Sequence, residues 1–194
     1  MMSAASTAGV MGLLVSPLAA FLALLLLLSG MHKIIRRDRS QSVVREFAGI
    51  PRVLAPFAVV VVAGTESLAG VLLLMPAYRV AGGVLAALLW AAYLGLILRA
   101  IAQGRRDVDC GCTFGIAHRP LGAFQVTRNA LLVGVSTLVA VGARVSMGAP
   151  ANIGSTAGGS VMISEILAVL ALMALYGALE QVMALTPPRG GAVL

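Results

Sequence analysis

The chain has 194 residues, of which 60% are hydrophobic and only 11% are charged. Soluble domains average about 25% charged residues, and a globule of this size could not bury so much apolar surface. A water-soluble enzyme is therefore excluded. The net charge of +7 does not indicate a nucleic-acid partner, because the lysine and arginine residues stand beside hydrophobic segments, where they normally set membrane topology.

Five stretches of the chain are each near the ~20 residues that a bilayer-spanning helix requires. They predict an all-α, polytopic transmembrane helical bundle embedded in the lipid bilayer. The remaining loops are too short for a soluble domain, which needs on the order of 100 residues. The predicted spans, in chain order, are residues 13–30, 53–75, 80–101, 124–143 and 161–185.

The spans divide the chain into a larger unit and a separate last helix. We expect the first four spans to form one membrane bundle, joined to the fifth by a segment rich in glycine, alanine and serine, which is typical of a loop. The predicted organisation is a tail (1–12), the four-span bundle (13–143) with a cysteine-containing loop (102–123), the Gly/Ala/Ser loop (144–160), the fifth span (161–185) and a second tail (186–194).

Positive charge is concentrated in alternate loops. No lysine or arginine precedes the first span, so that span is not a secretory signal, which carries its positive charge before the apolar core. The positive-inside rule predicts a multi-pass plasma-membrane protein with its N-terminus outside and its C-terminus in the cytoplasm. The residues that carry this prediction are Lys33, Arg36, Arg37, Arg39, Arg45 and Arg52, then Arg99, Arg105, Arg106 and Arg119.

Small residues at regular intervals predict close helix packing. Lipid gives helices no hydrophobic reason to associate, so close backbone approach through small side chains must take its place. The third span has small residues at every fourth position, and the second span has Ala63 and Gly70 near Glu66. We therefore predict a compact left-handed bundle with the second and third spans tightly paired. The stripe on the third span is Gly83, Ala87, Ala91 and Gly95.

The two cysteines of the chain, Cys110 and Cys112, are separated only by Gly111 in a polar loop. Glycine lets the backbone bend enough to close a small disulfide ring, and a strained, exposed disulfide exchanges readily. We interpret the pair as a redox-active dithiol. The alternatives stay open: a metal site with His118 as a third ligand, thiols without a role, and a structural disulfide. A ring of three residues restrains the unfolded chain very little.

Two charged residues lie inside predicted spans. A carboxylate at the depth of Glu66 is costly and is by default a functional candidate, unless it is protonated and hydrogen-bonded to a neighbouring helix. At 1.5 Å per residue, Arg128 is offset from Glu66 by roughly 10 Å in depth. We treat both as candidates for an acceptor or proton site, and we expect His32 and Lys33 to be interfacial anchors.

The cysteine motif forms part of a longer pattern. It consists of Gly30-Met31-His32-Lys33, Glu66-Ser67-Leu68-Ala69-Gly70, Asp109-Cys110-Gly111-Cys112, Phe114-Gly115 and Arg128-Asn129-Ala130-Leu131-Leu132. This pattern resembles the MauE family of methylamine-utilisation membrane proteins, which are grouped with DoxX-like redox-associated membrane proteins. The resemblance covers residues 13–143. Thr113 departs from it by separating Cys112 from the phenylalanine that directly follows the cysteine in the family pattern.

The resemblance implies a DoxX-like four-helix core and a role in maturing an exported, disulfide-rich dehydrogenase subunit beside a thioredoxin-like partner. We therefore expect an integral membrane thiol–disulfide redox protein in which Cys110 and Cys112 pass electrons to an acceptor, for which a quinone is a candidate. The alternatives are a non-enzymatic membrane assembly factor and a metal-handling protein that uses Cys110, Cys112 and His118. The positive-inside rule places the cysteines in the cytoplasm, where thiols are kept reduced, whereas the family role calls for access to the outer side.

Overall fold

The computed structural model describes residues 4–105, 122–147 and 159–185. These ranges are helical and contain no strand. The elements are α1 (Ala4–Ile35), α2 (Arg37–Ala48), α3 (Ala55–Leu74), the 3-10 helix η1 (Pro76–Tyr78), α4 (Arg79–Ala102), α5 (Ala123–Met147) and α6 (Gly159–Leu185). Five helical segments of the described residues are long and apolar enough to cross a membrane. The predicted all-α, multi-pass fold is confirmed.

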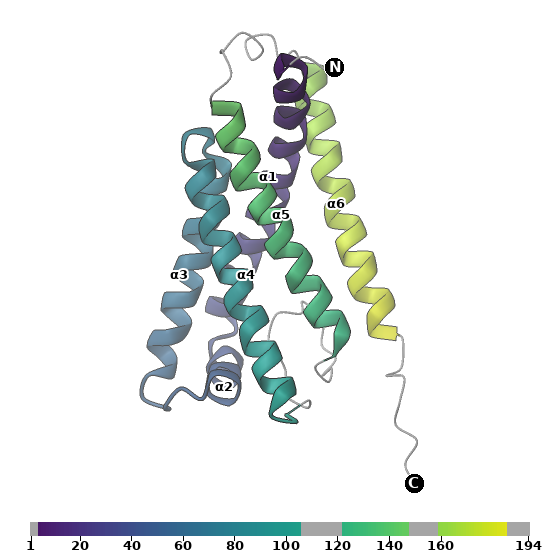
Figure 1. Cartoon of the computed structure of the whole chain (residues 1–194). Helices are drawn as coiled ribbons and strands as arrows, with labels where there is room; N and C mark the ends of the chain where they lie inside the picture. Colours follow the sequence, from purple (N-terminus) through teal and green to yellow (C-terminus); the bar gives the residue numbers. More distant parts are fainter. Residues whose placement is uncertain (1–3, 106–121, 148–158, 186–194) are drawn as a thin grey trace.

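The five long helices run side by side along the bundle (Figure 1). Helix α1 contacts α3, α5 and α6, while α4 packs between α3 and α5. Helix α2 lies at the end of the bundle where α1 and α4 end and where α3 begins (Figure 1). We call this end the α2 end.

The described helices differ from the predicted spans at both ends of α1 and in the loop after it. Helix α1 begins at Ala4 rather than at residue 13, so the prediction that residues 1–12 form a tail is wrong for residues 4–12. Helix α1 does not stop at Gly30 but continues to Ile35, with His32 and Lys33 in its last turn, where positive charge is favourable to the helix dipole. Residues 37–48, where the sequence predicts a loop, form the separate helix α2. It ends at Gly49, whose φ of 69° is the left-handed conformation that glycine adopts readily at helix ends.

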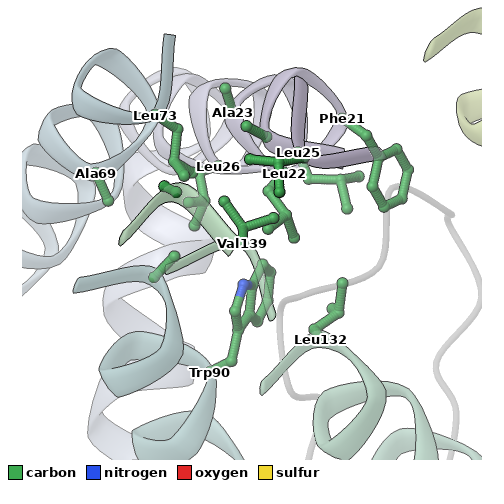
Figure 2. Close-up of a cluster of buried hydrophobic side chains, with 14 residues drawn as sticks. Phe21, Leu22, Ala23, Leu25, Leu26, Ala69, Leu73, Trp90, Leu132 and Val139 are labelled. Carbon is green, nitrogen blue, oxygen red and sulfur yellow. The ribbon is translucent and has the colours of Figure 1, made fainter. Parts of the chain in front are cut away.

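An apolar core closes the interior of the bundle. The side chains of Leu22, Leu26, Leu73 and Val139 are fully buried, and Trp90 is almost so. These residues come from α1, α3, α5 and α4, and they gather in one cluster (Figure 2). Packing of this kind fixes the helices against each other and so fixes the few polar side chains that lie among them.

The predicted small-residue stripe is not the packing face of α4. Gly83 does lie against Ala140 of α5, but Ala91 and Gly95 are exposed. Positions four residues apart rotate by about 40° around a helix at each step, so a long stripe of this spacing leaves any straight interface. The prediction that the stripe joins α4 to α3 is therefore wrong, although the two helices do pack together.

Helices α3 and α4 meet instead at Gly82, close to the hairpin that connects them. A Cβ atom at Gly82 would lie 2.7 Å from the backbone nitrogen of Leu73 and 2.9 Å from the carbonyl carbon of Leu72. On α3, Gly70 faces α1 rather than α4, because a Cβ atom there would lie 2.8 Å from the side chain of Leu27. The small residues of α3 thus serve the contact with α1.

Gly82→Ala should lower the free energy of unfolding by about 1–3 kcal/mol, the usual cost of forcing extra atoms into a packed contact. The added methyl group meets backbone atoms, which cannot turn away as a flexible side chain can. The matched control is Gly95→Ala in the same helix, where no atom lies within 4 Å of the added carbon. Unfolding in mixed detergent micelles should separate the two variants, and equal stability would contradict the close contact at Gly82.

Candidate functional site

The two charged residues predicted to lie within the membrane are both buried, but they do not pair with each other. Glu66 is paired with Lys33, and Arg128 is paired with Glu180. The two ion pairs involve different helices: α1 and α3 for the first, α5 and α6 for the second. The structure therefore divides the predicted acceptor or proton site into two separate places.

The carboxylate of Glu66 accepts hydrogen bonds from three side chains. The Lys33 ammonium donates to both carboxylate oxygens, at 2.7 Å and 2.9 Å, and the Tyr93 hydroxyl donates to Oε1 at 2.5 Å. The hydroxyl of Ser29 also donates to Oε1, at 3.1 Å, and accepts from Lys33 Nζ at 2.7 Å. We call these four residues the Glu66 cluster.

A close approach of α1 to α3 makes this cluster possible. A Cβ atom at Gly30 would lie 2.8 Å from Ser67 Oγ and 3.0 Å from the carbonyl oxygen of Ala63, so only glycine lets the two backbones come so near. Ser29 and Lys33 stand one helical turn apart on α1 and so share a face. The extension of α1 beyond Gly30 carries Lys33 to Glu66.

The Glu66 cluster keeps a charged pair inside the bundle at low cost. A buried charge is tolerated when it is paired and its remaining hydrogen bonds are satisfied. The three protons of the Lys33 ammonium meet three acceptors, and its nitrogen also lies 5.5 Å from the centre of the Tyr93 ring, within the range of a cation–π interaction. Lysine, tyrosine and glutamate can each carry a proton, so the cluster is equipped to hold or pass one.

The second ion pair joins α5 to α6. Arg128 Nη1 donates to Glu180 Oε1 at 2.6 Å. Next to Arg128, the buried Asn129 donates to the backbone oxygen of Gln125 at 2.8 Å, whereas its Oδ1 has no hydrogen-bond partner among the described residues. Glu180 is not among the site residues predicted from the sequence. It could have been found from its depth in the membrane, because its distance from the end of the fifth span matches the distance of Arg128 from the start of the fourth.

A small pocket adjoins the Glu66 cluster beneath α2. It has a volume of about 220 Å³, and Lys33 and Tyr93 contribute to its wall. The rest of the wall is apolar and comes from α2 and the residues just after it, α3 and α4: Val43, Val44, Phe47, Ala48, Ile50, Ala58, Val62, Leu96 and Ile97. The cluster and the pocket share two side chains and form our candidate site.

The predicted redox pair, Cys110 and Cys112, lies outside the described residues, as does His118. The described residues that are closest to them in the sequence belong to the α2 end of the bundle. Arg105, just after α4, donates a hydrogen bond to the backbone oxygen of Glu46 in α2. The segment that holds the cysteines therefore leaves and rejoins the described structure at the same end as the pocket.

A model of the family described as "Methylamine utilisation protein MauE" matches residues 11–143, well over half of the chain. The chain belongs to the MauE family. Two curated relatives carry the name methylamine utilization protein MauE. The protein from Paracoccus denitrificans is 26% identical over 156 residues, covering 79% of this chain and 84% of the relative. The protein from Methylophilus methylotrophus is 31% identical over 160 residues, covering 79% and 82%.

No solved structure matches the chain. The predicted resemblance to the MauE family is confirmed. The region matched by the family includes the whole Glu66 cluster, the two cysteines and Arg128. Glu180 lies beyond it, on α6. The partner of Arg128 thus comes from a helix outside the matched region.

Proposed function

We propose that this MauE-family membrane protein is a thiol–disulfide redox protein of the plasma membrane. It would support the maturation of, or disulfide formation in, an exported redox enzyme of the methylamine-dehydrogenase type, together with a thioredoxin-like partner. The methylamine-utilisation name of the family and of both relatives supports the metabolic setting. The observation that carries the redox role is the Cys110-Gly111-Cys112 motif.

The proposed exchange has two steps. A thiolate of the partner attacks one sulfur of the Cys110–Cys112 disulfide, forms a mixed disulfide and releases the other sulfur as a thiolate. The second thiolate of the partner then attacks the mixed disulfide, which frees the membrane protein as a dithiol and leaves the partner oxidised. To restore the disulfide, two electrons and two protons must pass to an acceptor, and a membrane quinone would become a quinol.

Of the two intramembrane candidates, we assign the acceptor or proton role to Glu66. Lys33 and Tyr93 contact its carboxylate and also contribute to the pocket wall. The Arg128 side chain instead binds Glu180 on α6, and we assign it the role of attaching that helix. Arg105, which precedes the segment that holds the cysteines, lies at the same end of the bundle as the pocket.

Trapping of a mixed disulfide tests the redox role. We expect a thioredoxin-like partner that lacks its second, resolving cysteine to accumulate a covalent adduct with the unaltered protein. Both Cys110→Ser and Cys112→Ser should lose this adduct and partner oxidation, because neither variant can form the disulfide that the partner attacks. Thr113→Ser is the control, since it alters the same loop without touching sulfur. If the double variant Cys110→Ser/Cys112→Ser accumulates normally and still supports maturation of the exported enzyme, the protein is an assembly factor and the redox role is wrong.

A further inference from the structure

We propose that the pocket beneath α2 binds the ring of an isoprenoid quinone, with Lys33 and Tyr93 at the oxygen-bearing edge of the ring. The inference rests on the proposed function in one respect, because the proposed exchange requires an acceptor that is soluble in the membrane. The site itself is argued from described residues that do not include the cysteines.

The size and lining of the pocket match a single substituted ring. Its volume of about 220 Å³ is below the ~300–1,000 Å³ of sites that enclose a drug-sized molecule. It therefore has room for one ring but not for a ring together with a long isoprenoid tail, which would extend into the bilayer. Phe47 contributes an aromatic side chain to a wall that is apolar apart from Lys33 and Tyr93.

The two polar residues of the wall fit the oxygen atoms of a quinone in both redox states. Lys33 can turn the N–H group that now donates to Ser29 toward a quinone carbonyl, while it keeps its hydrogen bonds to the Glu66 carboxylate. Ser29 would keep its own hydrogen bond to Glu66. The phenol oxygen of Tyr93 can accept as well as donate, so it can accept a hydrogen bond from a quinol hydroxyl. A plain hydrocarbon chain would use neither group.

The arrangement of positive charge favours a quinone over a phospholipid. Helix α2 carries Arg37, Arg39 and Arg45, which are the groups that attract anionic lipid headgroups, yet none of them contributes to the pocket wall. The one cation in the wall, Lys33, is already neutralised by Glu66 at 2.7 Å. A neutral ring with hydrogen-bonding oxygens meets this wall better than a phosphate does.

The single tryptophan of the chain provides a direct probe of binding. Trp90 is buried, and its ring centre lies 5.9 Å from that of Tyr93, so a quinone in the pocket would lie close enough to quench its fluorescence. We expect titration of the purified, full-length protein with decylubiquinone in detergent micelles to quench this fluorescence saturably.

Two neighbouring positions on α3 provide a matched pair of variants. Val62 contributes to the pocket wall, whereas Val61 is exposed on the outside of the bundle. Val62→Phe fills the pocket and should weaken decylubiquinone binding at least about tenfold, in keeping with the cost of overfilling a packed site, while Val61→Phe should bind as the unaltered protein does. Tyr93→Phe keeps the aromatic ring and removes only the hydroxyl, and it should weaken binding severalfold.

Several results would overturn the inference. Two of them are the absence of saturable quenching and equal binding by Val61→Phe and Val62→Phe. A third is displacement of decylubiquinone by an equal amount of n-decylbenzene or of phosphatidylglycerol. Displacement by phosphatidylglycerol would make this a lipid site. The titration is repeated on Cys110→Ser/Cys112→Ser, which should bind equally well. Binding without any trapped partner adduct would refute the proposed function and keep the pocket, whereas adducts without binding would refute only the pocket.

Discussion

A Lys33→Met variant should be less stable than the unaltered protein by about 3–5 kcal/mol at neutral pH, the usual cost of removing one partner from a buried ion pair. Methionine replaces the apolar stem of the lysine and removes its charge together with the hydrogen bonds that its ammonium donates to Glu66 and Ser29. The side chain of Glu66 is 0% exposed, so its carboxylate would lose its counter-charge with no route to water. The measurement is unfolding in mixed detergent micelles, followed by circular dichroism.

The double variant Lys33→Met/Glu66→Gln should recover most of that loss. A neutral pair no longer has an unpaired charge to bury, and the glutamine oxygen can still accept from Tyr93 and Ser29. Arg37→Met is the control, because Arg37 is an exposed cation just beyond α1, and its loss should change the stability by no more than about 0.5 kcal/mol. The single variant Glu66→Gln completes the comparison. If the stability losses of Lys33→Met and Glu66→Gln simply add in the double variant, Lys33 and Glu66 are not coupled and the described pair is wrong.

The sequence predicted the long helices well because their signal is strong and local. Runs of apolar residues of membrane-spanning length define α3, α4, α5 and α6, and the observed bounds differ from the predicted ones by only a few residues. Helix α2 was missed because it is short and charged, so that its apolar residues do not form a run. Its amphipathic face becomes visible only where Val43, Val44 and Phe47 meet the pocket.

The partner of Glu66 could not be predicted for a related reason. The sequence predicts that the first span ends at Gly30 and that Lys33 lies at the membrane surface, where basic residues usually serve as anchors. In the structure α1 continues, and the glycine predicted to mark its end is a point of close approach to α3. Lys33, predicted to be an anchor at the membrane surface, is therefore part of a buried hydrogen-bond network. Sequence periodicity carries no information on which of two roles a boundary lysine takes.

Glu180 was within reach of sequence reasoning. The fourth span begins and the fifth span ends on the same side of the membrane, so residues equally far from those two ends lie at the same depth. Arg128 and Glu180 meet this condition, and opposite charges at one depth in a small bundle are strong candidates for a pair. The cysteine motif is a different case, because its residues lie outside the described ranges and its role stays a proposal.

Glu180→Leu should destabilise the attachment of α6 more than Arg128→Leu does. The side chain of Arg128 is 4% exposed and that of Glu180 is 16% exposed, so removing the glutamate takes a counter-charge from the more buried member of the pair, at a cost of about 3–5 kcal/mol. Gln181→Leu is the matched control, since it makes the same kind of change at the exposed neighbouring position. Hydrogen exchange should accelerate in α6 of Glu180→Leu while α3 stays protected.

The outcome bears on how α6 belongs to the molecule. The region matched by the MauE family ends at residue 143, and α6 buries little of its own surface. The ring of Phe21 in α1 packs against that of Tyr176 in α6. If Glu180→Leu releases α6, the Arg128–Glu180 pair is what joins this helix to the family bundle. If α6 stays protected, packing along α1 alone is sufficient, and Arg128 must be stabilised by groups other than Glu180.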